Sequence, residues 1–208
     1  MIKIRVRFTK LGDIRFISHH DLMKVFERAI RRANIPVSMT QGFNPHPIFS
    51  IPLALGVGIV GRDEILELDL NEPMSPDALK ELLSPQLPEE IQVLSAESIP
   101  NFTKSSVSEA EYEVDVKDNS LLNTINISNF LQQSSINVTR IKNGQQKHFD
   151  IRPSIQKVEV KANRLLFSLK MTSDGMARPE EVVRTLLASE TKVFFGIIRT
   201  KVNLSSSG

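Results

Sequence analysis

The chain has 208 residues, 40% of them hydrophobic, and it contains no cysteine. This length supports one large domain or two small ones, each with an apolar core. The lack of cysteine excludes disulfide bridges, thiolate zinc sites and a cysteine-ligated iron–sulfur cluster on this chain. No apolar run approaches the roughly 18 residues of a membrane span, and the alternating N-terminus is unlike a signal peptide, so we expect a cytoplasmic protein without membrane contact.

The formal net charge is only +2, but the charges are segregated along the chain. Residues 1–50 carry +6, residues 51–137 carry −11 and residues 138–208 carry +7. Such segregation can present a basic face that attracts phosphate-bearing partners. Folding can equally mix the three blocks, because the charge of a segment is only weakly tied to the charge of a surface. The sequence alone leaves both interpretations open.

In the first half, residues 2–8 alternate apolar residues with Lys and Arg, which predicts a half-buried strand with a basic outer face. We expect residues 14–17 to extend this strand or to re-enter the sheet. Ser18 and Asp21 form a capping box, and a stripe of apolar residues predicts a helix from there to Ala33. Further strands are predicted at residues 37–39, 48–55, 64–70 and 91–97, and a second helix at residues 75–83.

The serine-rich residues 100–110 are predicted to be a linker, and residues 205–208 a disordered tail. Between them a similar order of elements recurs. Strands are predicted at residues 111–116, 137–142, 158–161, 165–171 and 194–202, and helices at residues 120–131 and 178–187.

The order β-α-β-β-α-β is that of ferredoxin-like folds. We therefore predict an α+β protein with two tandem ferredoxin-like halves, residues 1–99 and 111–204. Each half would have an antiparallel sheet with its helices on one face. A single α+β domain with a continuous sheet is an equally simple alternative.

The first helix and the proline-flanked loop at residues 42–47 contain most of the candidate binding residues. The helix is basic on its polar side, and Phe43 in the loop is suited to stacking on a base. The candidate contacts to nucleic acid or phosphate in this region are His19, Lys24, Arg28, Arg31, Arg32, Phe43, Asn44 and His46.

Three interpretations of His19, His20 and His46 remain open. They can donate hydrogen bonds to phosphates or base edges, or take the 2′-hydroxyl proton in RNA cleavage while a cation stabilises the phosphorane. His19 can instead pack beside the helix, just as Phe43 can anchor its loop by burial. We expect no metal site, because no His-x-x-x-His pair occurs and adjacent histidines point in different directions on a helix.

Arg152 and Arg178 each precede a proline in the basic C-terminal third and are further candidates for phosphate contacts. The alternative is that Arg178 starts a helix and Arg152 pairs with Asp150. Glycines 56, 58 and 61 superficially fit Gly-x-Gly-x-x-Gly. An acidic strand rather than a helix follows them, so we expect no dinucleotide or other cofactor.

Two stretches of this sequence, residues 16–36 and residues 42–56, closely resemble the radical SAM-linked proteins of bacteria. The first begins Phe-Ile-Ser-His-His-Asp-Leu-Met, and the second begins Gly-Phe-Asn-Pro-His-Pro. Weaker marks of the same family are residues 150–153, 178–180 and 199–200. The family pattern has Leu where this chain has His20, so the resemblance singles out His19 as the histidine of the motif.

The resemblance implies a domain that occurs fused to the C-terminus of a radical SAM protein, often one with a cobalamin-binding region, or as a stand-alone protein beside an E/G-type ribonuclease. It brings no catalytic residues with it. We therefore expect an accessory, RNA-directed binding module that works with a radical SAM or ribonuclease partner. The alternatives are a metal-independent endoribonuclease or nucleotide-modifying enzyme using His19 or His46, and a protein-docking scaffold whose interface includes the acidic residues 63–118.

Overall fold

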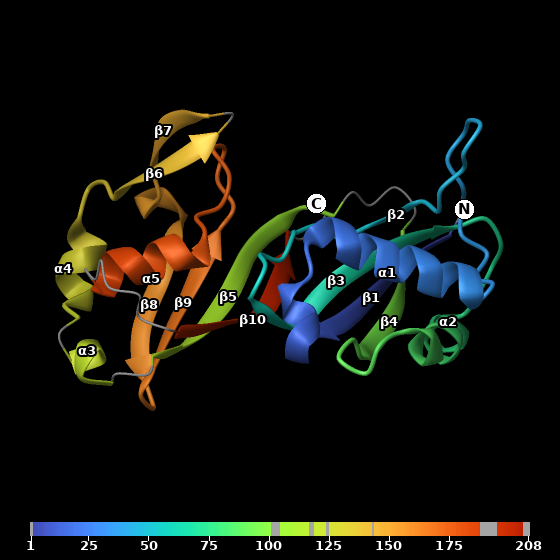
Figure 1. The fold of residues 1–208 in the computed structure, drawn as a ribbon, viewed down its shortest axis with the longest axis horizontal. Helices are drawn as coiled ribbons and strands as arrows, with labels where there is room; N and C mark the ends of the chain where they lie inside the picture. Colours follow the sequence, from blue (N-terminus) through green and yellow to red (C-terminus); the bar gives the residue numbers. More distant parts are fainter. Residues whose placement is uncertain are drawn as a thin grey trace. The chain divides into compact units, whose positions relative to one another are not determined.

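The computed structural model describes residues 2–100, 105–116, 119–123, 125–142, 144–187 and 195–205. The chain divides into two compact units, one of residues 1–107 with 204–208 and one of residues 108–203. Helices and strands alternate in both, which confirms the predicted α+β class (Figure 1). Within the described residues, no helix is long and apolar enough to cross a membrane.

The first unit is built on a small antiparallel sheet. Strand β1 pairs with β3 on one side and β4 on the other, and the short β2 pairs with β3. Its main elements are β1 (Ile2–Lys10), α1 (His19–Arg32), β2 (Phe49–Ser50), β3 (Val60–Leu70), α2 (Pro76–Leu83) and β4 (Val93–Ile99).

Alternation along β1 places Ile4, Val6 and Phe8 on the core face of this sheet. Both helices add apolar residues to the same core, and the rings of Phe8 and Phe26 meet edge to face at 4.8 Å. Each fully buried side chain of this kind contributes roughly 1.5–3 kcal/mol of transfer free energy. The helices therefore cover one face of the sheet, and Lys3, Arg5 and Arg7 of β1 lie on the other.

The predicted start of α1 is confirmed. The Ser18 hydroxyl accepts a hydrogen bond from the Asp21 backbone N–H at 3.1 Å, which satisfies one of the free donors of the first turn. The helix ends at Arg32, and Asn34 follows with a φ of 50°, in the left-handed region that terminates helices. This short, sharply bounded helix presents one polar face.

Residues 14–17 neither extend β1 nor re-enter the sheet, contrary to the prediction. They belong to a 3-10 helix, η1 (Gly12–Phe16), and to the link before α1. The cause is Lys10, whose buried ammonium group donates to the carbonyl oxygens of Arg15 at 3.3 Å and Ile17 at 3.0 Å. These two bonds bend the chain where strand pairing would otherwise continue.

The predicted strands at residues 37–39 and 48–55 are much shorter in the structure. Val37 and Met39 form only isolated bridges, to Leu70 and Pro47, and β2 has two residues. Prolines at 47 and 52 flank β2 and have no N–H to donate to a ladder, so the strand cannot lengthen in either direction. The chain between residues 39 and 47 instead forms a protruding loop.

The second unit contains two groups of strands. Strands β10, β5, β9 and β8 are neighbours in that order, and β6 and β7 form a separate two-stranded sheet. Its elements are β5 (Val107–Val116), α3 (Asn119–Asn123), α4 (Ile127–Gln132), β6 (Asn137–Lys142), β7 (Gln145–Asp150), β8 (Ile155–Lys161), β9 (Arg164–Lys170), α5 (Pro179–Leu187) and β10 (Phe195–Leu204).

Three predictions for this half need correction. The single helix expected at residues 120–131 is divided into α3 and α4, because the Asn126 side chain caps α4 by accepting from the Asn129 N–H at 2.9 Å. Strand β7 was not predicted. Strand β5 already begins at Val107, inside the expected linker. Residues 101–104 of that linker and 206–208 of the expected tail lie outside the described residues.

A candidate nucleic-acid interface on the first helix

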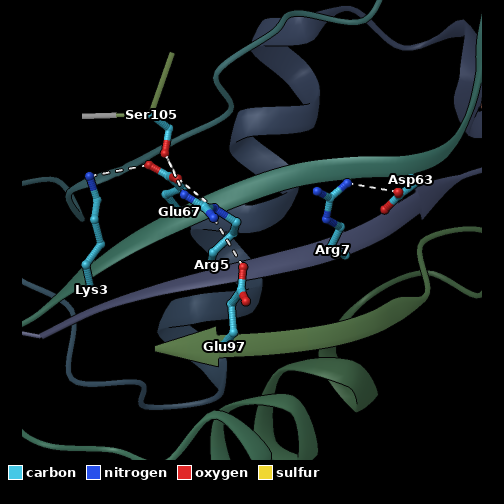
Figure 2. Close-up of polar contacts among 7 residues, drawn as sticks. All are labelled: Lys3, Arg5, Arg7, Asp63, Glu67, Glu97 and Ser105. Atoms are coloured by element: carbon cyan, nitrogen blue, oxygen red, sulfur yellow. Dashed lines mark hydrogen bonds and ion pairs between the residues drawn. The ribbon is translucent and has the colours of Figure 1, made fainter. Parts of the chain in front are cut away.

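The basic face of β1 is neutralised by carboxylates from the neighbouring strands, on the side of the sheet turned away from α1 (Figure 2). The central acceptor is Glu67, which is only 2% exposed. Its two oxygens lie 3.4 Å from Lys3 Nζ and 3.0 Å from Arg5 Nε. The Ser105 hydroxyl also donates to Glu67, and it accepts from Arg5 Nη2 at 2.8 Å.

The pairing continues on both sides of Glu67. Arg5 reaches Glu97 on β4 at 3.2 Å, and Arg7 reaches Asp63 on β3 at 2.8 Å. All three acids come from the acidic middle block of the sequence. Here folding does mix the charge blocks, and the cations Lys3, Arg5 and Arg7 of β1 form ion pairs within the sheet.

The exposed face of α1 keeps a net positive charge. His20, Lys24, Arg28 and Arg31 are all exposed and recur at spacings of three or four residues, which gives one stripe about 16 Å long. Acids of α1 itself lie near two of them, with Asp21 3.6 Å from Lys24 and Glu27 3.1 Å from Arg31. Arg32 leaves this stripe. Its guanidinium donates to the side chain and backbone oxygens of Gln86, at 3.2 Å and 2.5 Å.

A protruding loop lies beside the C-terminal half of α1. It appears in Figure 1 as a narrow light-blue loop between α1 and β2. The Thr40 N–H donates to the His46 carbonyl at 2.9 Å, and the His46 N–H returns a bond to the Thr40 hydroxyl at 2.9 Å. Phe43 is fully exposed in this loop and Asn44 is exposed too. Burial as an anchor therefore does not explain Phe43.

Glu27 joins the loop to the helix. One of its oxygens lies 3.1 Å from His46 Nδ1 and 3.1 Å from Arg31 Nη2, and Arg31 also donates to the Pro45 carbonyl at 3.1 Å. The hydrogen bond from His46, together with that from Arg31, outweighs burial and lowers the pKa of Glu27. An ionised carboxylate only accepts hydrogen bonds, so Nδ1 of His46 carries the proton in this contact. The other ring nitrogen, Nε2, takes no part in the contact with Glu27.

Sequence reasoning missed the contact of Glu27 with His46. The available signal was its position as the single acid between Lys24 and Arg32 on the face that also carries Arg28. Such an isolated acid on a basic face is a natural anchor for a neighbouring loop. The contact itself depends on the path of residues 38–48, which the sequence does not reveal.

His19 and His46 do not lie together. His19 lies half-buried in the first turn of α1, eight residues before Glu27, the contact of His46. Eight residues of helix span about 12 Å, so the two histidines lie far apart along the axis. Within the described residues, no group of three or more His, Asp or Glu side chains is arranged to hold a metal ion.

Arg152 and Arg178 both lie in the second unit. The Arg152 guanidinium donates to the backbone oxygens of Leu131 at 3.1 Å and 2.6 Å and of Ile155 at 3.0 Å. Asp150 accepts from the backbone N–H of Arg152, at 3.0 Å, rather than from its guanidinium. Arg178 precedes α5 with an exposed side chain. Arg152 thus has a structural role, and Arg178 starts a helix.

Comparison with curated proteins finds no match to this chain. A family model described as an uncharacterized protein conserved in bacteria, DUF2344, matches residues 3–179. That match includes β1, the whole of α1, the protruding loop and the second unit as far as the first residue of α5. Because the match covers most of the sequence, the chain belongs to the DUF2344 family of conserved bacterial proteins.

Proposed function

We propose that this chain is an accessory RNA-directed binding module, and that α1 and the loop at residues 40–47 form its contact surface. The observation that carries the proposal is the full exposure of Phe43 beside a helix face that keeps its cations. A large apolar ring held in water has no role in the packing of this unit. Beside a basic stripe, it is well suited to stack on a nucleic-acid base.

The parts of this surface would contribute differently to binding. Arg28 and Arg31 would contact phosphates and supply most of the affinity, without regard to sequence. Phe43 would stack on a base, and the Asn44 amide could read a base edge. The hydrogen bonds of Glu27 to Arg31 and His46 hold the loop beside the helix before RNA arrives, which reduces the entropy lost on binding.

The resemblance described above supports a role beside a radical SAM or E/G-type ribonuclease partner. The chain has no cysteine, so a radical SAM cluster would have to come from that partner. A pure docking scaffold is less well supported, because Asp63, Glu67 and Glu97 of the acidic block already pair with β1. Co-purification of a partner that survives nuclease treatment would favour the scaffold.

The double substitution Arg28→Glu with Arg31→Glu tests RNA binding. We expect it to weaken affinity at low salt by about a hundredfold, because two phosphate contacts become repulsive. Fluorescence anisotropy with a labelled RNA hairpin carrying a single-stranded tail measures the effect, and wild-type affinity should fall steeply with salt.

The control is Lys157→Glu with Lys161→Glu, which makes the same change in net charge on exposed residues of β8. It should leave RNA affinity within about twofold of wild type. These lysines are not part of the proposed contact surface, so only the weak long-range attraction of the net charge changes. Absence of wild-type binding at low salt would eliminate the proposed function. Equal losses in the two double variants would eliminate this surface.

A second candidate function, RNA cleavage, is favoured by the contact between Glu27 and His46. Glu27 holds the Nδ1 proton, so Nε2 could take the 2′-hydroxyl proton of RNA while Arg31 stabilises the phosphorane. The 2′-oxygen would attack phosphorus and the 5′-oxygen would leave with a proton from water. This reaction predicts 2′,3′-cyclic phosphate products in EDTA, and His46→Ala should slow it by about 10² or more.

Cleavage is measured by gel electrophoresis of end-labelled RNA over long incubations. Glu27→Gln is the informative companion variant, because it keeps the shape of the side chain and removes the charge that orients the imidazole. RNA that stays intact, or cleavage that is unchanged in His46→Ala, would argue decisively against the enzyme.

We also infer that the two units are two tandem ferredoxin-like halves. The strand neighbours β4-β1-β3-β2 in the first unit and β10-β5-β9-β8 in the second support this. We count the four strands of each unit along the chain, leaving out β6 and β7. In both units the fourth strand then lies beside the first, and the third lies between the first and the second. The second unit would then differ mainly by the inserted β6–β7 hairpin.

A further inference from the structure

We propose that the RNA surface contains a second base-stacking platform, made of Phe16 and Arg15, and that its ligand is therefore single-stranded nucleic acid. This inference rests on the proposed function and deepens it. The platform lies just before α1, whereas Phe43 lies in the loop beside the far half of that helix. Sequence reasoning did not select either Phe16 or Arg15 as a binding residue.

Phe16 is 56% exposed, and it is the second large exposed aromatic side chain of the described first unit. The guanidinium carbon of Arg15 lies 4.5 Å from the centroid of its ring. A planar cation on an aromatic ring gives a flat, positively charged surface, on which a base can stack while its phosphate is attracted. Phe43 and Phe16 thus offer the same chemistry in two places.

Three hydrogen bonds fix the backbone around Phe16. The ammonium group of Lys10 is fully buried and donates to the carbonyl oxygens on both sides of Phe16, those of Arg15 and Ile17. The Gly58 N–H donates to the same Arg15 oxygen at 2.8 Å. These three bonds hold a large apolar ring at the surface instead of letting the segment fold inward. A preorganised platform of this kind loses little entropy when a ligand binds.

Along the axis of α1, most of the basic stripe lies between the two platforms. From the first residue of α1 to Glu27 and Arg31, which hold the loop, the helix advances roughly 12 to 18 Å. A stacked strand rises about 3.4 Å per nucleotide, so about four to six nucleotides would cover this distance. Lys24 and Arg28 lie between the platforms, where the phosphates of such a strand would pass.

The exposed rings select against a double helix. In a duplex both faces of each base are covered by their neighbours, so only an unpaired or terminal base can stack on a protein side chain. With two separated platforms, the bases at both ends of a short segment must be free to stack on protein side chains. RNA and DNA single strands share this chemistry, and only contacts to the 2′-hydroxyl would separate them.

The test compares wild type, Phe43→Ala, Phe16→Ala and the double variant, using fluorescence anisotropy at low salt. The probes are a labelled 12-nucleotide RNA, its blunt duplex, a 3-nucleotide RNA and a 12-nucleotide DNA. Ile141→Ala, a substitution of an exposed apolar residue in the second unit, is the matched control. Circular dichroism confirms that each variant folds, as expected for side chains at the surface.

We expect the 12-nucleotide RNA to bind about tenfold or more tightly than the duplex. Each Phe→Ala change should weaken its binding by roughly tenfold, and the double variant by more, while duplex affinity stays within about twofold. Phe16→Ala should matter much less for the 3-nucleotide RNA, which cannot reach both platforms. Similar affinity for the DNA would identify general single-strand binding, still in support.

Three results would overturn the inference. Duplex binding equal to single-strand binding would remove the basis for stacking, and a Phe16→Ala variant equal to Ile141→Ala would remove the second platform. In both cases wild-type RNA binding would persist, so the proposed function would stand. No binding to any probe would remove both the function and this inference.

Discussion

Replacing Glu67 with alanine is expected to lower the free energy of unfolding by about 3–5 kcal/mol. Glu67 is nearly inaccessible and directly faces Arg5 across the β1–β3 ladder, with Lys3 on its other oxygen. Both cations are mostly covered as well, with 15% of each side chain exposed. Without Glu67 they keep their desolvation cost and lose their main counter-charge. Urea unfolding followed by circular dichroism measures the change.

Glu97→Ala is the matched control for this prediction. Glu97 is also directly opposite Arg5, but on β4, and its side chain is 60% exposed. Ion pairs exposed to water contribute about 0–1 kcal/mol, so Glu97→Ala should have a small effect. If both variants lost equally little stability, the cluster would contribute nothing beyond ordinary surface pairs.

Replacing Glu181 with alanine is expected to cost about 3 kcal/mol in the second unit. Its two oxygens accept from Arg140 on β6 at 2.7 Å each, and one also accepts from the Arg178 N–H at 2.9 Å. The side chain therefore caps α5 and binds the hairpin strand at once. The guanidinium of Arg140 also lies 4.5 Å from the ring centroid of Phe149. Glu180→Ala, one residue earlier in the same turn, should cost under about 1 kcal/mol.

The contribution of Glu181 should depend on pH. Burial acts to raise the pKa of Glu181, but the hydrogen bonds from Arg140 and from the Arg178 N–H outweigh it, and the pKa lies below its usual value. The stabilisation is therefore complete above the usual pKa of a glutamate and is lost as the pH falls through the lower, folded-state pKa. The stability gap between wild type and Glu181→Gln should narrow in acid. A gap that stays constant with pH would mean that the ion pair is not its source.

Local signals predicted those parts of the fold in which neighbours in sequence decide the structure. The capping box at Ser18 and the prolines at the starts of α2 and α5 gave three helices almost correctly. Alternation gave β1. The β6–β7 hairpin was missed although Asn143-Gly144 is a strong turn signal. The reason is that β7 is polar on both faces and shows no alternation.

The site was predictable only in part, because charge at the surface depends on which strands pair. The sequence indicated basic residues on both β1 and α1. Only the register of β1 between two acidic strands, with Arg5 opposite Glu67 and Glu97, shows that the β1 cations are neutralised. Helical spacing alone predicted the exposed stripe of α1. The burial of Lys10 and the contact between Glu27 and His46 arise from tertiary packing.

The β6–β7 hairpin is a sheet of its own, and isolated two-stranded hairpins are marginal in water. Most of its side chains face solvent, so little apolar area holds it in place. Its amide hydrogens should exchange through local opening, at a lower free energy than those of the neighbouring β5–β9 ladder. The second unit therefore combines a cooperative four-stranded sheet with a hairpin that depends largely on contacts outside itself, such as that of Arg140 with Glu181. This hairpin can open without disturbing the four-stranded sheet.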